Sequence, residues 1–144
     1  MMQGGSIGFK VSLESASPRM QKVMRKNLNI EKFRENLEYV CKNYPDAITS
    51  VNTMHGFPTE TEEEAMMTLN FIKDIKWIHF PYVHVVKIFP GTGLEEFALD
   101  HGVARKAINE ATDKAYHVVT PTLPFPKEFT DRYKLNFIKN YVFN

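Results

Sequence analysis

The stretch Val51-Asn52-Thr53-Met54-His55-Gly56-Phe57-Pro58-Thr59-Glu60-Thr61-Glu62-Glu63-Glu64 decides the expected fold. It begins as the end of a buried strand, and the Gly-Phe-Pro sequence that follows predicts a sharp turn. Three acidic residues then stand where a helix would begin, and the helix dipole favours negative charge there. The stretch therefore predicts a strand-to-helix corner of an α/β unit. Because ligands and catalytic groups collect at the carboxyl ends of parallel strands, we expect the functional site near this corner.

Further strands and helices are predicted on both sides of this corner. Alternation and β-branched content predict strands over residues 7–13, 47–54 and 82–88, with a loop over 77–81. Apolar periodicity predicts helices from Pro18 to about residue 26 and over 30–43, 61–75 and 94–101. Ser17 is the expected N-cap of the first helix, and Asn27-Leu28-Asn29 ends it. The alternating order predicts a parallel sheet with right-handed crossovers.

The C-terminal part of the sequence has a different character. Residues 105–117 are moderately helical, three prolines predict an extended linker over 120–126, and residues 127–143 predict an amphipathic helix. We therefore expect a partial barrel over residues 1–103 and a helical tail over 104–144. The predicted fold class is α/β: a partial TIM-like barrel of about three parallel β-α units with a helical tail. A three-stranded parallel sheet has two open edges and is seldom self-sufficient, so the sequence predicts a piece of something larger.

Composition excludes several function classes. A chain of 144 residues with 43% hydrophobic residues predicts one domain, and a net charge of +1 gives no electrostatic case for nucleic acid or a membrane surface. No apolar run approaches the roughly 20 residues that span a bilayer, and no signal peptide is apparent, so a cytoplasmic location is expected. The single cysteine, Cys41, excludes an internal disulfide and a cysteine-only metal site built from this chain, and its helical stripe predicts a core position.

Three segments carry a resemblance to a known family. They are Glu14–Pro18 followed by Met24–Asn27, then Met54–Thr61, then Phe89–Thr92. In this order they resemble signature segments of radical S-adenosylmethionine (radical SAM) enzymes, particularly the cobalamin-binding branch that includes anaerobic magnesium-protoporphyrin IX monomethyl ester oxidative cyclases. The resemblance covers about residues 7–103 and implies the last three of six β-α units of a radical SAM barrel. One departure is Thr59, where the family commonly has Gly.

The resemblance also implies chemistry and partners. The family uses S-adenosylmethionine and a [4Fe-4S] cluster to generate a 5'-deoxyadenosyl radical that abstracts hydrogen from a small-molecule substrate. The CxxxCxxC loop that holds the cluster is absent from this sequence, so the chain is expected to be inactive alone and to need a missing N-terminal half of the barrel. The parent would be an iron-sulfur oxidoreductase or methyltransferase, and resemblance to this branch implies cobalamin in an upstream domain. Open sheet edges predict possible self-association.

The resemblance assigns the family's cofactor contacts to the residues that occupy matching positions in this sequence. Glu14 matches a residue that binds the ribose hydroxyls, and Lys26 matches the base that neutralises the cofactor carboxylate, with Arg25 as the adjacent alternative. Asn52 matches a polar position that reaches the nucleoside.

The adenine contacts are expected from two later segments. The Gly56 turn would let the backbone approach the adenine. Ile88 and Phe89, at the expected end of the third strand, would form an apolar wall against it. No catalytic residue and no metal ligand is assigned in this chain.

Simpler interpretations stay open. Glu14 and Asn52 could cap helices or turns, the basic residues of the first helix could be a solvated face, and His55 could be a hydrogen-bonded structural residue. The alternative function is a stand-alone α/β module that binds a nucleotide or a protein without redox chemistry. A hydrolase would need a nucleophile and base, for which Ser15 with His55 is the only candidate pair.

Overall fold

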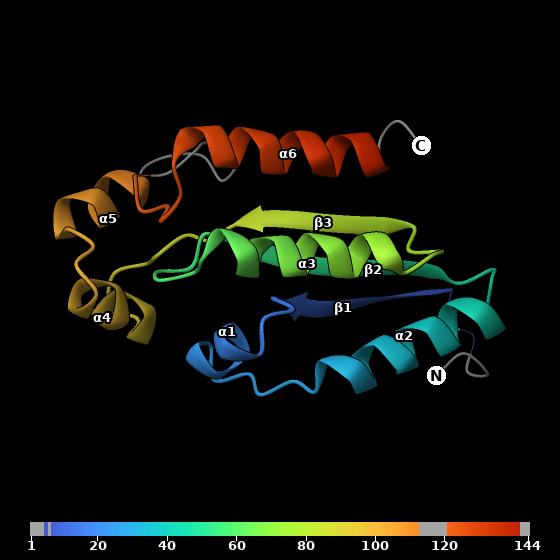
Figure 1. Cartoon of the computed structure of the whole chain (residues 1–144). Coiled ribbons are helices and arrows are strands. Elements are labelled where there is room, and N and C mark those ends of the chain that lie inside the picture. The colour runs from blue at the N-terminus through green and yellow to red at the C-terminus, as the bar shows by residue number, and fades with distance from the viewer. Residues whose placement is uncertain (1–4, 6, 113–120, 142–144) are drawn as a thin grey trace.

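The computed structural model describes residues 5, 7–112 and 121–141 as a small parallel sheet with helices (Figure 1). The strands are β1 (Gly8–Glu14), β2 (Ile48–His55) and β3 (Phe80–Val85), all parallel, in the order β1-β2-β3. The helices are α1 (Pro18–Val23), α2 (Ile30–Asn43), α3 (Glu62–Asp74), α4 (Gly93–Asp100), α5 (Arg105–Thr112) and α6 (Lys127–Tyr141). The predicted α/β partial barrel with a C-terminal helix is confirmed.

The two faces of the sheet differ in character. Residues pointing to one face, such as Leu13 and Val51, join a core cluster with α2, α3 and α6. That cluster includes Cys41, which is 5% exposed as predicted. Residues of the opposite face alternate with them and are half-buried or exposed; they include Lys10, Ser12, Ser50, Asn52, Met54, Tyr82 and His84. This polar face is the one that a closed barrel would turn inward.

Helix caps explain where the helices begin. Ser17 accepts a hydrogen bond from the Met20 N–H and Pro18 follows it, while Asn29 caps α2 by accepting from Lys32 N–H. At the corner, Thr61 and Glu64 form a reciprocal capping box at the start of α3. The acidic run of the opening stretch therefore fixes the first turn of α3.

The third strand lies earlier than the sequence predicts. It covers Phe80–Val85 instead of residues 82–88, so the expected loop over 77–81 runs into the strand. β3 ends where β2 does, because His55 pairs with Val85 and the chain turns away at Gly56. Pro81 is tolerated because β3 is an edge strand.

The C-terminal segment packs onto the rest of the chain. Phe125, Phe129 and Tyr133 are buried in the same core cluster as strand and α3 residues. Residues of both expected parts of the chain thus share one core, and the division at residue 103 stays a prediction. The expected extension of α5 towards residue 117 and of α6 towards 143 lies outside the described residues. Of the helices in the part of the chain that the structure describes, none is long and apolar enough to cross a membrane.

Candidate functional site

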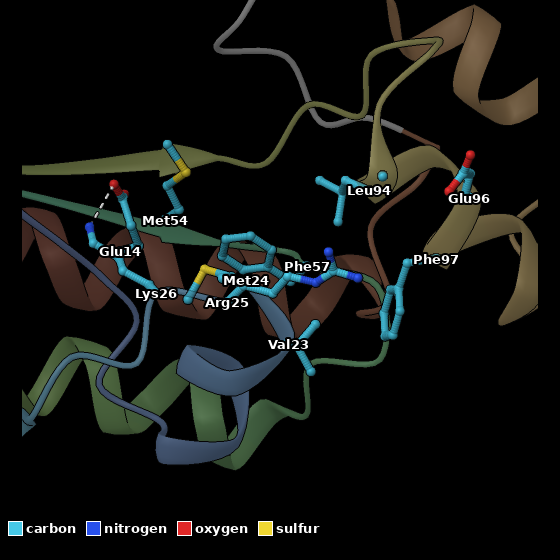
Figure 2. Close-up of a pocket in the computed structure, with 11 residues that line it drawn as sticks. Glu14, Val23, Met24, Arg25, Lys26, Met54, Phe57, Leu94, Glu96 and Phe97 are labelled. Carbon is cyan, nitrogen blue, oxygen red and sulfur yellow. Dashed lines mark hydrogen bonds and ion pairs between the residues drawn. The ribbon is translucent and has the colours of Figure 1, made fainter.

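A cavity of about 660 Å³ lies at the carboxyl ends of β1 and β2. Figure 2 shows Glu14 and Lys26 together at one end, and Glu96 and Phe97 of α4 at the other. Its lining comprises Glu14, Val23, Met24, Arg25, Lys26, Met54, Phe57, Gly93, Leu94, Glu96 and Phe97. The volume is that of a typical small-molecule site. Charged groups lie at both ends, and between them Arg25 lies among apolar side chains (Figure 2).

Glu14 and Lys26, twelve residues apart in the sequence, meet in the cavity. Lys26 Nζ lies 3.3 Å from Glu14 Oε1 and donates to the Ser12 carbonyl oxygen at 2.5 Å. The other carboxylate oxygen, Glu14 Oε2, is buried without a hydrogen-bond partner among the described residues. A buried carboxylate oxygen without a donor is a site where a hydroxyl group could bind.

Backbone strain accompanies this pair. The register between β1 and β2 shifts between Ser12 and Glu14, and Glu14 adopts a φ of 65°. Arg25, also in the lining, has a φ of 55°. Left-handed conformations of residues other than glycine are uncommon and cluster at functional sites.

Gln21 holds the loop after α1 against the end of β1. Its side-chain nitrogen Nε2 donates to the carbonyl oxygens of Leu13 at 2.8 Å and Ser15 at 2.6 Å, and its backbone carbonyl oxygen accepts the Lys26 N–H at 3.0 Å. Gln21 is 2% exposed. Sequence reasoning missed it, because a glutamine on a short basic helix gives no signal of burial.

The β2–α3 corner forms another wall of the cavity through Phe57. The amides of Gly56 and Phe57 both donate to Glu60 Oε2, at 2.6 and 3.2 Å. Gly56 has a φ of 89°, and a Cβ placed on it would overlap the side chain of Leu123. Close packing against Leu123 is thus a second reason for glycine at position 56. The expected contact of Gly56 with the adenine stays a prediction. Thr59, where the family commonly has glycine, has a φ of 69°.

Asn52, Ile88 and Phe89 do not line the cavity. Asn52 lies on the polar face, where its Nδ2 is 3.4 Å from Ser12 Oγ and its Oδ1 is buried without a partner among the described residues. Ile88 is fully buried against Ala98 and Ile108, so its side chain offers no free wall. Phe89 is 42% exposed. The expectation that Ile88 and Phe89 end the third strand is wrong, because β3 ends at Val85.

His55 points away from the cavity. It is 1% exposed, its ring stacks on Tyr133 with centroids 4.6 Å apart, and burial lowers its pKa to about 4. Ser15 Oγ instead lies 3.3 Å from Thr68 Oγ1, within hydrogen-bonding distance. The arrangement therefore favours the structural interpretation of His55 and gives no nucleophile-base contact between Ser15 and His55.

Residues that could hold an iron-sulfur cluster are not grouped in the part of the chain that the structure describes. Across residues 5, 7–112 and 121–141, no three His, Cys, Asp or Glu side chains are arranged to bind a metal ion. The sequence has one cysteine, and Cys41 is buried on α2 away from the cavity lining. The donor set for a [4Fe-4S] cluster is thus absent, whereas the cavity fits an organic ligand with hydroxyl and carboxylate groups.

Comparison with known protein families finds a match to the N-terminal half of this chain. Residues 2–72 match the model of the Radical SAM superfamily. This segment is a radical SAM superfamily domain. The match includes Glu14, Lys26, Asn52 and Gly56, and the radical SAM family uses S-adenosylmethionine and a [4Fe-4S] cluster.

Curated relatives of this chain include enzymes that act on tRNA. It is 29% identical over 124 residues to the threonylcarbamoyladenosine tRNA methylthiotransferase MtaB of Bacillus subtilis, which is 86% of this chain and 26% of that protein. It is 31% identical over 99 residues to the tRNA-2-methylthio-N(6)-dimethylallyladenosine synthase of Thermobifida fusca, covering 68% of this chain and 19% of that protein. The chain thus spans about a quarter or less of the length of these relatives.

These relatives support a radical SAM enzyme and leave its reaction class open. They do not support the expected resemblance to magnesium-protoporphyrin cyclases, and nothing in them points to cobalamin. The specific branch expected from the three sequence segments is therefore not upheld, while the superfamily is.

Proposed function

We propose that this chain supplies the S-adenosylmethionine contacts of a radical SAM enzyme whose cluster ligands come from another part of the fold. The observation that carries the proposal is the Glu14–Lys26 pair at one end of the cavity, with Glu14 Oε2 left without a partner. A nucleoside with an attached amino acid needs acceptors for ribose hydroxyls and a cation for its carboxylate, and this end of the cavity holds one of each.

Each residue has a distinct role in this proposal. Glu14 would accept hydrogen bonds from the ribose hydroxyl groups, since an ionised carboxylate is an acceptor with room for several donors. Lys26 would exchange its contact with the Ser12 carbonyl oxygen for one with the cofactor carboxylate. Met24, Phe57 and Leu94 would pack against apolar parts of the ligand. When bound at a cluster, S-adenosylmethionine supplies the radical chemistry, and these residues only orient it and exclude water.

The remaining cofactor contacts involve residues outside the cavity lining. Asn52 would reach the nucleoside from the polar face of the sheet, where its Oδ1 lacks a partner among the described residues. Gly56 would approach the adenine with its backbone. Phe89, exposed after β3, would need to turn toward the ligand, and Ile88 would contribute only as support for the α4 wall.

Binding of S-adenosylmethionine to the purified 144-residue chain, measured by titration calorimetry, tests the site. Lys26→Met and Glu14→Gln should each weaken binding about tenfold, the size of one lost charge-assisted contact. Lys22→Met is the matched control, because Lys22 is an exposed lysine on α1 that does not line the cavity. Equal affinities for wild type and both cavity variants would overturn the assignment.

The polar face of the sheet is the proposed substrate wall. Tyr82 and His84 lie exposed on β3, and Lys10 Nζ is 4.7 Å from the centre of the Tyr82 ring. Across the strands, Ser12, Asn52 and Tyr82 stand side by side in register. A surface of aromatic and hydrogen-bonding side chains suits a planar, polar substrate such as a nucleobase.

The reaction of the intact protein is proposed as methylthio transfer to a tRNA nucleoside. The support is that relatives matching most of this chain are a tRNA methylthiotransferase and a tRNA-2-methylthio-N(6)-dimethylallyladenosine synthase. An oxidoreductase remains the runner-up, and the net charge of +1 means that tRNA affinity would have to come largely from other regions. Mass spectrometry of tRNA from a strain that lacks the gene would test this: loss of a methylthio-nucleoside supports it, and unchanged tRNA contradicts it.

A partner that completes the barrel follows from the open strand β1. Next to it, Phe9, Val11, Phe33, Leu37 and Val40 line an apolar groove of about 400 Å³. We propose that a further β-α unit, carried by the rest of the protein, pairs with β1 and fills this groove. Without it, the 144-residue chain should self-associate through this edge, which light scattering would detect. A clean monomer at high concentration would instead favour the second candidate, a stand-alone nucleotide-binding module, which the single cysteine also allows.

A further inference from the structure

The β2–α3 corner, residues 55–60, has a second side that faces the C-terminal segment. On that side the ring of His55 stacks on Tyr133 with centroids 4.6 Å apart and a 12° angle between the planes. Phe125 lies 6.3 Å from the same His55 ring. These three aromatic side chains are each less than 10% exposed. The corner is therefore clamped by residues that come about 70 positions later in the sequence.

Leu123 fits the corner at its glycine. A side-chain carbon on Gly56 would overlap Leu123 Cδ2, so the leucine occupies the space that the missing Cβ leaves. Close approach of this kind is possible only at glycine. Leu123 itself is half-buried and belongs to the main core cluster.

Contacts within the corner link its position to the shape of the cavity wall. Glu60 Oε2 accepts the N–H groups of Gly56 and Phe57, so the two amides move together. Phe57 is 5% exposed and packs with Met20 and Val86 in a cluster that also touches Met24, Met54 and Leu94. Several of these side chains line the cavity, so a displaced corner changes the shape of the cavity wall.

We propose that Tyr133 and Leu123 are positioning residues that hold the β2–α3 corner in the shape required to bind the adenosyl ligand. This inference rests on the proposed function for its ligand, although the positioning itself is a property of the chain. The C-terminal segment would then act on the site from behind, without touching the ligand. Loss of the segment, or its undocking by a partner, would weaken binding while leaving the charged end of the cavity intact.

A matched control distinguishes positioning from simple stabilisation. Tyr141 is on the same helix, packs against the same core cluster and pairs with Phe137 at a ring distance of 5.3 Å. It lies two helical turns beyond Tyr133, towards the opposite end of the sheet, as the course of α6 in Figure 1 shows. Tyr141→Ala should thus remove aromatic packing from α6 without releasing the corner.

Amide hydrogen exchange of residues 54–60, together with calorimetric titration with S-adenosylmethionine, tests the proposal on the 144-residue chain. Tyr133→Ala should speed exchange at Gly56 and Phe57 about tenfold relative to Tyr141→Ala, compared at urea concentrations that give both variants equal global stability. Tyr133→Phe, which keeps the stacked ring, should restore wild-type exchange. Leu123→Ala serves as the second variant if Tyr133→Ala does not fold, and should show the same local effect.

The two measurements separate the two ideas. Equal exchange at Gly56 and Phe57 in the Tyr133 or Leu123 variant and the Tyr141 variant would overturn the positioning role. Faster local exchange with about tenfold weaker S-adenosylmethionine binding would support it. Faster exchange with undiminished binding would refute the link to the ligand. A wild-type chain that does not bind S-adenosylmethionine would refute the proposed function, and the exchange data would still decide the positioning role.

Discussion

Replacing Glu60 with glutamine should change how stability depends on pH. Glu60 is 3% exposed, its Oε2 accepts two backbone N–H groups, and its Oε1 has no hydrogen-bond partner among the described residues. Burial raises its pKa from 4.5 to about 7, although the two N–H groups act in the opposite direction. A glutamine keeps an oxygen for those N–H groups and carries no charge.

The sign and size follow from the pKa. An acid with a raised pKa in the folded state keeps its proton longer there than in the unfolded chain, so stability falls as pH rises from 4.5 to about 7. At 1.36 kcal/mol per pKa unit, the full loss is about 3 kcal/mol. Glu60→Gln should therefore match wild type below pH 4.5 and exceed its free energy of unfolding by up to about 3 kcal/mol above pH 7.

His55 opposes this effect in the same pH range. Burial lowers its pKa from 6.5 to about 4, so the folded state loses stability as pH falls between those values. The pH profile of wild type alone would mix the two groups. The difference between wild type and Glu60→Gln isolates Glu60, because both proteins contain His55.

Urea unfolding followed by circular dichroism, at a series of pH values between 4 and 8, measures this difference. A constant difference across the series would contradict the raised pKa. A variant that is less stable than wild type above pH 7 would show that the carboxylate charge stabilises the corner, and the reasoning from burial would be wrong.

Three further substitutions or reactions have expected outcomes. Thr61→Ala removes the capping box with Glu64 and should lower the free energy of unfolding by about 1 kcal/mol in urea titrations. Arg19→Met removes the main contact that depresses the pKa of Glu64 to about 2, so wild type should be more stable than the variant above pH 4.5 and should lose that advantage as pH falls from 4.5 to about 2. The thiol of Cys41, whose pKa is raised by burial, should resist a disulfide reagent in the native state and react fully in urea.

Local sequence signals predicted most helices well because their causes are local, but α1 ends at Val23 instead of about residue 26, and Arg25 after it has a left-handed backbone. The bounds of α2 are those expected, since Asn29 caps the helix and Tyr44-Pro45 ends it. The bounds of α3 are one residue inside the prediction at each end. β3 was misplaced because the β-branched run continues past Val85, whereas a strand lasts only as long as its partner does. The local sequence pattern of one strand does not show where its pairing with a distant strand ends.

The sequence predicts those site residues that directly follow strand ends. It does not predict those whose positions depend on packing between distant elements. Glu14 and Lys26 were expected in one site, and the structure brings them to 3.3 Å. The opposite wall, formed by α4 through Phe97, gave no signal because it depends on how α4 returns across the sheet. The contact between His55 and Tyr133 joins segments 78 residues apart, and no periodicity could reveal it.

The left-handed backbone conformation of Glu14 and Arg25 lowers the stability of the fold at two residues whose side chains belong to the ligand site. Each such residue costs about 1–2 kcal/mol relative to glycine, and both side chains line the cavity. Glycine at either position would relax the backbone and remove a charged side chain from the site. Selection of variants for heat resistance alone should therefore favour glycine at these two positions early. Ligand binding would then weaken while the stability of the fold increased.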